Sequence, residues 1–283
     1  MSNSKPHTAV EASAYLHHLK FLSADPAALT RFYCGTMQMA LMRQDGDDYY
    51  LAGPGRRLII GKGASKTLAR IAFATRDGHG LGALRARAES EGLKPKPFAT
   101  LLMADGAFAV TDPDGTEVVF GSAIKGLEPS GIKGPLQHLA LATRSIQPVV
   151  DFYQGKLGFA VSDRIEAEDG RLMSCFMRSN HEHHTVTVFV QDRQGMDHHA
   201  YETGEWVGIR DWCDHFAARR IPLFWGPGRH GPGNNLFAFI EDPDGNRIEI
   251  SAELEVVHDR QVKVWPHTEH TVNLWGRGLI RAK

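Results

Sequence analysis

The stretch Asp242-Pro243-Asp244-Gly245-Asn246-Arg247-Ile248-Glu249-Ile250 is a turn that leads directly into a strand. Proline presets the backbone of one turn position and glycine accepts the left-handed angle of another, so Asp-Pro-Asp-Gly predicts a tight turn. Side chains alternate along a strand, so Ile248 and Ile250 should share one face while Glu249 lies on the other. A carboxylate among β-forming residues is costly unless it is paired or binds a metal. Taken alone, Glu249 could also lie on a solvated sheet face.

The chain repeats itself, which predicts duplicated supersecondary units. The same turn occurs at Asp112-Pro113-Asp114-Gly115, and Arg31-Phe32-Tyr33-Cys34-Gly35 is echoed by Asp151-Phe152-Tyr153-Gln154-Gly155. Each half of the chain contains two units, and each unit is expected to be a strand, a helix and a short meander of strands. The fold class is therefore α+β, with four repeated βαβββ units that form two domains.

The first strand and the helix of each unit can be placed from periodicity and capping residues. We expect opening strands at 15–23, 68–75, 136–142 and 196–202, with helices that begin near Asp25 and Ser145 and cover 80–91 and 206–219. This predicts a structural domain at 1–122, a linker at 123–134, a catalytic domain at 135–252 and a tail at 253–283. The tail contains Trp265 and Trp275, and it could fold back as a lid or pack against a neighbouring subunit.

Composition excludes several classes of protein. The 283 residues are 42% apolar and 23% charged, with a net charge of -1, so neither nucleic acid nor a membrane is an expected partner. Three widely spaced cysteines predict neither a disulfide framework nor a zinc site, and the N-terminus lacks the layout of a secretion signal. We expect a cytoplasmic protein. The 15 histidines are the unusual feature.

Two histidines occupy equivalent positions in the third and fourth units. His138 and His198 each lie on an opening strand, and each is followed two places later by an alanine that leaves room beside it. Together with Glu249 they form a set of two histidines and one carboxylate on three strands. This is the facial triad that binds non-haem Fe(II) and leaves coordination positions open.

The N-terminal half is an internal control for this interpretation. Its matching positions are His18, Arg70 and Val119, so only one of the three ligands is present there. That half should therefore be structural and bind no metal.

Further histidines can reach the same site. His183 and His184 enter a strand, and neighbours on a strand face opposite sides, so only one of them can face the metal. The other, together with His181, should lie on the surface. His230 lies in the loop Gly226-Pro227-Gly228-Arg229-His230-Gly231, whose composition suits the positioning of a side chain.

These motifs resemble the vicinal-oxygen-chelate (glyoxalase/bleomycin-resistance) superfamily and, within it, the type I extradiol ring-cleavage dioxygenases. The resemblance is carried by Leu136-Gln137-His138, His184-Thr185-Val186, Asp197-His198-His199-Ala200-Tyr201, the His230 loop and the final turn with Glu249. It implies two domains, each a cup-shaped mixed sheet with helices outside. It also implies an enzyme that opens a catechol-like ring next to its hydroxyls with O₂, giving a semialdehyde or keto acid, in the breakdown of aromatic compounds. A homo-oligomer is the expected assembly.

The resemblance assigns roles to individual residues. His138, His198 and Glu249 would bind Fe(II), or Mn(II), which suits the same ligands. His184 would be the acid/base near O₂, with a pKa near the working pH, and His230 would hydrogen-bond the substrate.

Two departures from the family concern the substrate. Phe239 stands where the family usually has a tyrosine, and Trp225 replaces the arginine with which arylacetate-cleaving members grip a carboxylate. With Phe176 as a further wall, the pocket should be apolar and should favour a neutral or multi-ring aromatic diol.

Two other functions fit the same scaffold. One is a glyoxalase-like isomerase or lyase with Zn²⁺, Ni²⁺ or Co²⁺, although such sites usually take ligands from both halves. The other is a metal-free binding protein of the drug-resistance type, which would leave the two histidines and the glutamate without a purpose.

Overall fold

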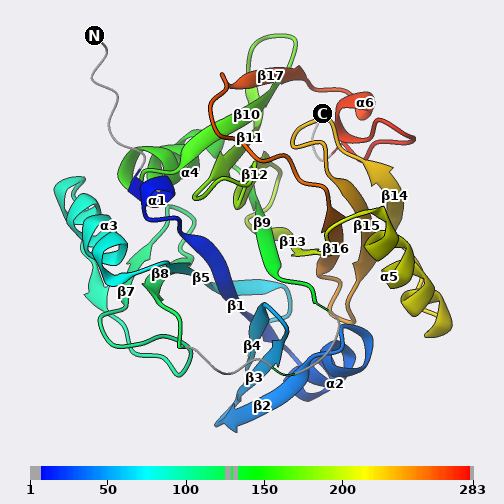
Figure 1. Cartoon of the computed structure of the whole chain (residues 1–283), viewed down its shortest axis with the longest axis horizontal. Coiled ribbons are helices and arrows are strands. Elements are labelled where there is room, and N and C mark those ends of the chain that lie inside the picture. Colours follow the sequence, from blue (N-terminus) through cyan, green and yellow to red (C-terminus); the bar gives the residue numbers. More distant parts are fainter. Residues whose placement is uncertain (1–7, 125–128, 130–132, 281–283) are drawn as a thin grey trace.

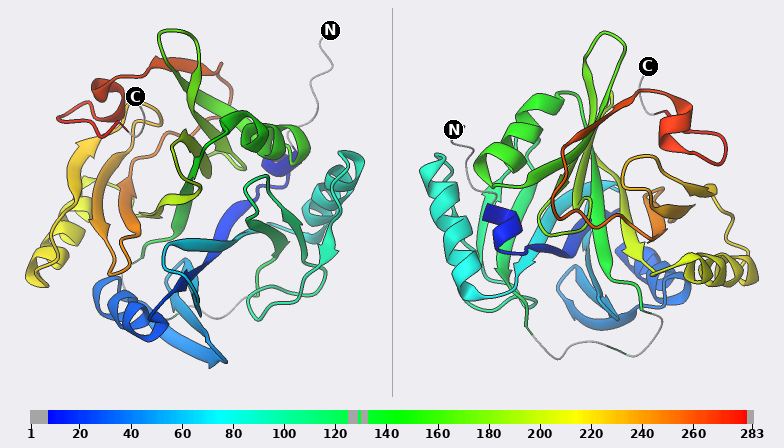
Figure 2. Two further views of the ribbon diagram at one scale, coloured as in Figure 1. Left: turned by 180° about the vertical axis from the view of Figure 1, so that it is seen from behind. Right: turned by 45° about the horizontal axis from the view of Figure 1, so that its top comes forward.

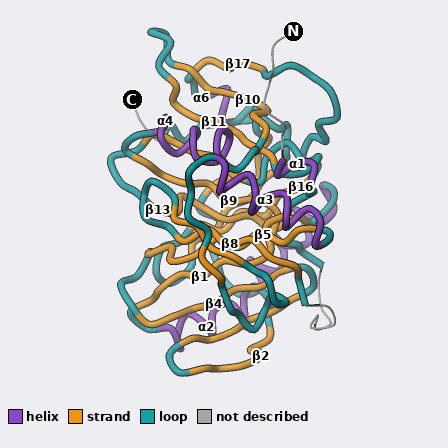
Figure 3. Tube along the Cα trace, turned by 90° about the vertical axis from the view of Figure 1, so that its left-hand side faces the viewer, coloured by secondary structure: helices purple, strands orange, loops and turns teal. Residues whose placement is uncertain are grey.

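The computed structural model describes residues 8–124, 129 and 133–280. In this part of the chain the strands form two mixed sheets, one of eight and one of nine strands, and the main helices lie outside them (Figures 1 and 3). The expected α+β fold is therefore confirmed. No described helix combines the length and the apolar character needed to span a membrane.

Each half contains two units with the same order of elements, a strand, a helix and three further strands. The first unit comprises β1 (Tyr15–Ser23), α2 (Pro26–Thr36), β2 (Ala40–Asp45), β3 (Asp48–Gly53) and β4 (Arg56–Lys62). The second comprises β5 (Thr67–Thr75), α3 (Gly78–Ser90), β6 (Lys96–Pro97), β7 (Phe108–Thr111) and β8 (Glu117–Ser122). A short helix, α1 (Thr8–Glu11), precedes them.

The C-terminal half repeats this order. Its first unit comprises β9 (Leu136–Thr143), α4 (Ile146–Val150), which continues as a π-helical turn (Asp151–Lys156), β10 (Ala160–Glu166), β11 (Leu172–Arg178) and β12 (Val186–Val190). Its second comprises β13 (Gly195–Glu202), α5 (Trp206–Ala218), β14 (Trp225–Arg229), β15 (Leu236–Glu241) and β16 (Arg247–Ala252). The tail adds β17 (Lys263–Pro266) and α6 (Glu269–Val272).

Strand pairing is the same in every unit. The last strand returns parallel to the first, as in β1 with β4, β5 with β8, β9 with β12 and β13 with β16. The opening strands of the two units in each half pair antiparallel at the middle of the sheet, β1 with β5 and β9 with β13. The predicted repeat of four βαβββ units is confirmed.

The predicted elements agree closely with the observed ones. The opening strand 15–23 is observed with the same ends, and the other three differ from prediction by one residue at an end. The predicted linker lies largely outside the described residues, and the division into domains stays a prediction. Asp25 caps α2 as expected, because its side chain accepts a hydrogen bond from the amide of Ala28 at 2.9 Å.

Both Asp-Pro-Asp-Gly turns are stabilised by their first aspartate. The Asp112 carboxylate accepts hydrogen bonds from the amides of Asp114 and Thr116, at 3.0 and 2.8 Å. Asp242 binds the equivalent amides of Asp244 and Asn246 at the same two distances. Each turn thereby fixes where the last strand of its half begins.

The tail folds back onto its own chain. Strand β17 pairs parallel with β10, with Asp163 opposite Lys263, and extends the C-terminal sheet by one strand. Figure 2 shows this orange-to-red segment crossing the C-terminal half before it reaches α6. Of the two alternatives, the structure shows the fold-back. Whether the tail also contacts another subunit stays a prediction.

The matching face of the N-terminal sheet is covered by its own side chains. A cluster of small residues and one methionine occupies it: Ala72, Ala74, Met103, Ala107, Ala109 and Val119. Arg70 forms an ion pair with Glu117 at 2.6 Å and lies over the ring of Phe98. The C-terminal sheet instead surrounds a cavity lined by histidines and apolar side chains.

We expect Gly115→Ala to destabilise the fold. Gly115 has a φ of +91° with open space around its Cα, so only backbone strain opposes a methyl group there. The left-handed conformation costs a non-glycine residue about 1–2 kcal/mol. Thermal denaturation should show a lower midpoint, whereas Gly82→Ala, in the interior of α3 and also in open space, should not lower it. Equal midpoints for the two variants would contradict the assignment of this turn.

Candidate metal centre

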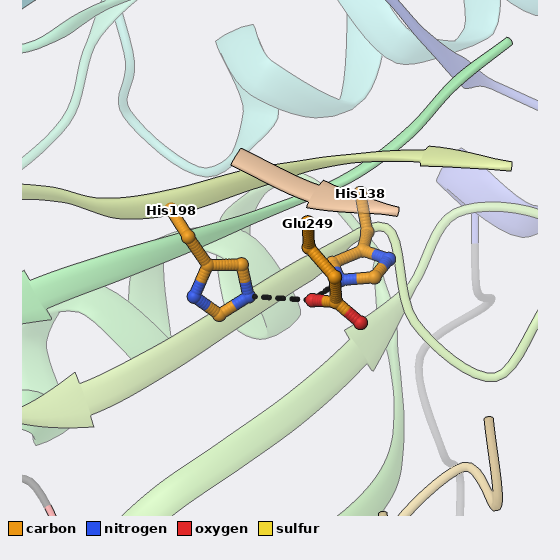
Figure 4. Close-up of side chains that lie close together, drawn as sticks. All are labelled: His138, His198 and Glu249. Atoms are coloured by element: carbon orange, nitrogen blue, oxygen red, sulfur yellow. Dashed lines mark hydrogen bonds and ion pairs between the residues drawn. The ribbon is translucent and has the colours of Figure 1, made fainter. Parts of the chain in front are cut away.

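Three buried side chains meet on the concave face of the C-terminal sheet. His138 on β9, His198 on β13 and Glu249 on β16 are at most 5% exposed. Their ligand atoms all lie within 4.8 Å of one another, and they form the one such group of three among the described residues. Figure 4 shows both imidazoles pointing at the same carboxylate. The Nε2 atoms of His138 and His198 each lie 3.2 Å from Oε2 of Glu249.

Strand register brings these residues together. His138, Ala200 and Glu249 are paired across β9, β13 and β16, so they stand in one row. His198 is two residues before Ala200 and therefore projects from the same face. The alanine at the centre of the row leaves the space into which the three side chains converge.

Two β-bulges supply the partners that orient the histidines. Pairing of β9 with β13 skips one residue in each strand, and the skipped residues are Gln137 and Asp197. His138 Nδ1 lies 3.2 Å from Gln137 Oε1, and His198 Nδ1 lies 2.7 Å from Asp197 Oδ1. Because both oxygens are acceptors, each imidazole donates from Nδ1. Bulges commonly redirect a side chain in this way near functional sites.

This arrangement leaves electron pairs facing each other. An imidazole that is neutral and protonated on Nδ1 has a lone pair on Nε2, so two nitrogen lone pairs and a carboxylate oxygen point at one place. Three acceptors in a buried site need a positive charge between them. Two imidazoles and one carboxylate suit Fe(II) and Mn(II), and orienting partners on the second ring nitrogen are typical of metal-binding histidines. The residues present therefore fit a divalent metal ion.

The charges of the site agree with this reading. Burial alone would raise the pKa of Glu249, but the adjacent imidazoles of His138 and His198 hold it well below its usual range. Burial lowers the pKa of His198, but its contacts with Asp197 and Glu249 outweigh this and raise it. The carboxylate is thus an anion, and His198 is the neighbour whose protonated form its contacts favour.

Asn235 fixes the second oxygen of the glutamate. Its Nδ2 donates to Oε1 of Glu249 at 2.9 Å and to Oγ of Ser251 at 3.0 Å. This fully buried residue was missed by the sequence analysis, since an asparagine in a loop before β15 has many ordinary explanations.

His184 and His230 lie beside the three residues and line the same cavity. The ring centroids of His184 and His138 are 4.3 Å apart. His230 donates from Nδ1 to the carbonyl of Val272 at 2.6 Å, so the Nε2 of a neutral His230 is an acceptor, 3.8 Å from Oε1 of Glu249. The structure therefore brings together all five histidine and glutamate side chains that were predicted for the site.

Two expectations about the histidine pair were wrong. His183 is not a surface residue: it is fully buried, and its Nε2 lies 3.1 Å from Oδ2 of Asp163. His184 does not have a pKa near neutrality, because burial, and then the nearby imidazoles of His138 and His183, lower it well below its ordinary value. His184 is therefore a neutral imidazole at working pH. His181 is exposed, as expected.

The rest of the cavity wall is apolar except for Thr187. It consists of Ile165, Phe176, Thr187, Phe189, Pro232 and Val272, of which Phe176 was predicted. Among the residues that the structure describes, no lysine or arginine lines it. Trp225 and Phe239 are not part of this lining: the Trp225 ring centroid lies 5.5 Å from that of His230, and the Phe239 ring meets His198 edge-on at 5.1 Å. Phe239 is paired with Glu249 and Trp225 with Phe239, so both rings project from the same sheet face as Glu249, and their contact with a substrate stays a prediction.

The N-terminal half carries the same row without the ligands. His18 is paired with Ala72, and Ala72 with Val119, in the register of the C-terminal row. Arg70 takes the position of His198 and is paired with Glu117 as His198 is with Arg247. The internal comparison made from the sequence therefore has the correct register.

Comparison with known proteins supports the resemblance. Residues 136–250 match the family model "Glyoxalase/Bleomycin resistance protein/Dioxygenase superfamily". Metapyrocatechase 2 of Cupriavidus necator is 28% identical over 145 residues, which is 50% of this chain and 44% of that protein. The match thus spans less than half the length of this relative.

Solved structures share the fold over nearly the whole chain. Homoprotocatechuate 2,3-dioxygenase from Arthrobacter globiformis has a TM-score of 0.81 at 24% identity, covering 99% of this chain and 93% of that one. A Mn(II)-bound glyoxalase from Novosphingobium aromaticivorans has a TM-score of 0.82 at 24% identity, covering 94% and 92%.

We expect Glu249→Gln to lose most of its metal affinity. Glutamine keeps the shape of the side chain but removes the negative charge that the three converging groups share. After anaerobic incubation with Fe(II) and desalting, elemental analysis should find the wild type loaded and the variant nearly free of iron. Glu253→Gln, an exposed change on the same segment, is the matched control. Full occupancy in Glu249→Gln would exclude this glutamate as a ligand.

Proposed function

We propose that this chain, whose residues 136–250 belong to the glyoxalase/bleomycin-resistance/dioxygenase superfamily, is an Fe(II)-dependent extradiol dioxygenase. Its substrate would be a neutral aromatic ring with two adjacent hydroxyls, opened next to them by O₂. The observation that carries the proposal is the meeting of two Nδ1-protonated imidazoles and an anionic carboxylate at one buried point beside a further pair of histidines.

His138, His198 and Glu249 would hold the iron on one side only. Bound Fe(II) would supply open coordination positions at which the diol and O₂ are held next to each other, and would pass charge between them. Holding the diol and O₂ next to each other removes the entropic cost of their encounter. The remaining steps belong to protein side chains.

His184 and His230 would manage the protons of the reaction. His230 accepts through Nε2, because its Nδ1 proton is used by Val272, and this suits a substrate hydroxyl. His184 would take a proton from the diol and return it as the O–O bond breaks. General acid/base catalysis of this kind contributes roughly 10²–10⁴ in rate. The apolar wall excludes water that would compete for these protons.

The cavity lining supports a neutral substrate. No described lysine or arginine lines it, so a substrate carboxylate would be buried without a partner. Phe176, Phe189 and Ile165 offer flat apolar contacts to a ring.

A diol panel tests this proposal. With protein loaded with Fe(II) under anaerobic conditions, admission of air should give yellow ring-opened product from catechol or 2,3-dihydroxybiphenyl. Product should form at least ten times faster than from 3,4-dihydroxyphenylacetate, because the carboxylate of that substrate has no cation to meet. Equal or faster cleavage of the acid would contradict the inferred pocket. No cleavage of any diol, with turnover of a glutathione hemithioacetal instead, would indicate the glyoxalase-type alternative.

We expect His184→Ala to keep its iron and lose turnover. The alanine removes the acid/base group but none of the three metal-binding side chains, so iron content should match the wild type while kcat falls by about 10²–10⁴-fold. His181→Ala, an exposed change nearby, is the control. Undiminished kcat in His184→Ala would remove this residue from the mechanism.

A further inference from the structure

The buried neighbour of His184 connects it to a carboxylate. The Nδ1 atoms of His183 and His184 are 2.9 Å apart, so one of them donates to the other. The Nε2 atom of His183 lies 3.1 Å from Oδ2 of Asp163 and 3.9 Å from Oε2 of Glu255. The contact with Asp163 is an ion-pair distance, and Nε2 makes no hydrogen bond of regular geometry with a described residue.

Asp163 is a buried anion with several donors around it. Its side chain is fully buried and accepts from Nη1 of Arg260 at 2.9 Å and from Nε1 of Trp265 at 2.8 Å. Burial would raise its pKa, but the contacts with His183, Trp265 and Arg260 hold it below the ordinary value. A carboxylate can only accept, so the proton of a neutral His183 is placed on Nε2, facing it.

This direction determines where the protons of His184 lie. A neutral His183 that is protonated on Nε2 has a lone pair on Nδ1, so His184 must donate from its own Nδ1. The Nε2 of His184 then presents a lone pair to the cavity. Asp163, on one side of the histidine pair, therefore determines that Nε2 of His184, on the cavity side, is a proton acceptor.

We propose that Asp163, His183 and His184 form a proton relay. As the substrate hydroxyl O–H bond breaks, a proton joins Nε2 of His184. At the same time the Nδ1–H bond of His184 breaks and a new N–H bond forms on Nδ1 of His183. His184 remains neutral throughout, and the positive charge comes to rest on His183 beside Asp163. The reverse transfer returns the proton to the ring-opening intermediate.

The electrostatics of the cavity favour this route. His184 is buried and its ring centroid lies 4.3 Å from that of His138, so a positive charge on it would be enclosed beside a metal-binding imidazole. His183 faces Asp163 and Glu255 on its other side, with Arg260 and Lys263 bound to the same acids. Asp163 and His183 touch no substrate, so they act as positioning and relay residues rather than as catalytic groups.

The far end of the relay is built by the tail. Glu255, Arg260 and Trp265 all belong to the segment after β16, and the amide of His183 donates to the carbonyl of Glu255 at 2.8 Å. The tail also contributes Val272 to the cavity wall and the carbonyl that orients His230. The orientation of both His184 and His230 therefore depends on the tail being packed in this position.

The relay can be tested without metal or substrate. In metal-free full-length protein labelled with ¹⁵N-histidine, long-range ¹H–¹⁵N spectra report which ring nitrogen carries the proton. We expect His184 protonated on Nδ1 in the wild type and in His183→Asn, whose side-chain oxygen still accepts. We expect a shift to Nε2 in His183→Phe, which has no acceptor. A wild-type His184 protonated on Nε2 would overturn the relay.

A kinetic test of the relay rests on the proposed function, and its result is interpreted separately from the NMR result. His183→Asn can accept a hydrogen bond but cannot carry the proton, so kcat should fall about 10–100-fold with unchanged metal content and KM, as for other residues that orient a site from behind. In H₂O–D₂O mixtures the kcat of this variant should vary linearly with the deuterium fraction. The kcat of the wild type should follow a curve, because two protons move together. His181→Gln is the control. A wild-type kcat in His183→Asn would contradict the relay. The absence of any diol cleavage would contradict the proposed function instead, and the NMR result would then decide the relay.

Discussion

The structure depends on one electrostatic constraint: three electron-pair donors converge at a buried point and need a positive charge between them. Gln137 and Asp197 hold the Nδ1 protons of two imidazoles, so that their Nε2 lone pairs point inward, and Asn235 holds the remaining oxygen of Glu249. Each of these partners would be costly to bury without the interaction it makes. The site is thus prepared for a cation by groups that do not themselves contact it.

The repeated unit explains why the site lies where it does. In every unit the last strand returns parallel to the first, so the middle of each sheet is formed by opening and closing strands in fixed register. His138, Ala200 and Glu249 occupy one such row, and an alanine in the middle makes the row concave. The tail then covers the concave face. The fold supplies the position, and a few substitutions supply the chemistry.

Much of this could be predicted from the sequence, because the repeats and the alternation along strands are local signals. The three converging residues and the ends of the opening strands followed from them. Alternation could not reveal Gln137 and Asp197, since a bulge turns each toward its own neighbour. It also could not show that His183 is buried, because Asp163 and the tail that cover it are distant in sequence. Phe239 and Trp225 are in register with Glu249 across β15 and β14, as their strand positions implied, and their contact with a substrate stays a prediction.

The N-terminal half shows a second solution to the same problem of charge. Arg70 stands at the position of His198, pairs with Glu117 and is covered by Phe98. A guanidinium is part of the chain and cannot dissociate, so the positive charge that balances Glu117 is permanent. On the proposed function, starvation for metal or exposure to a chelator would therefore alter only the C-terminal half of the chain. The N-terminal half would stay folded, and the C-terminal half could then bind metal again.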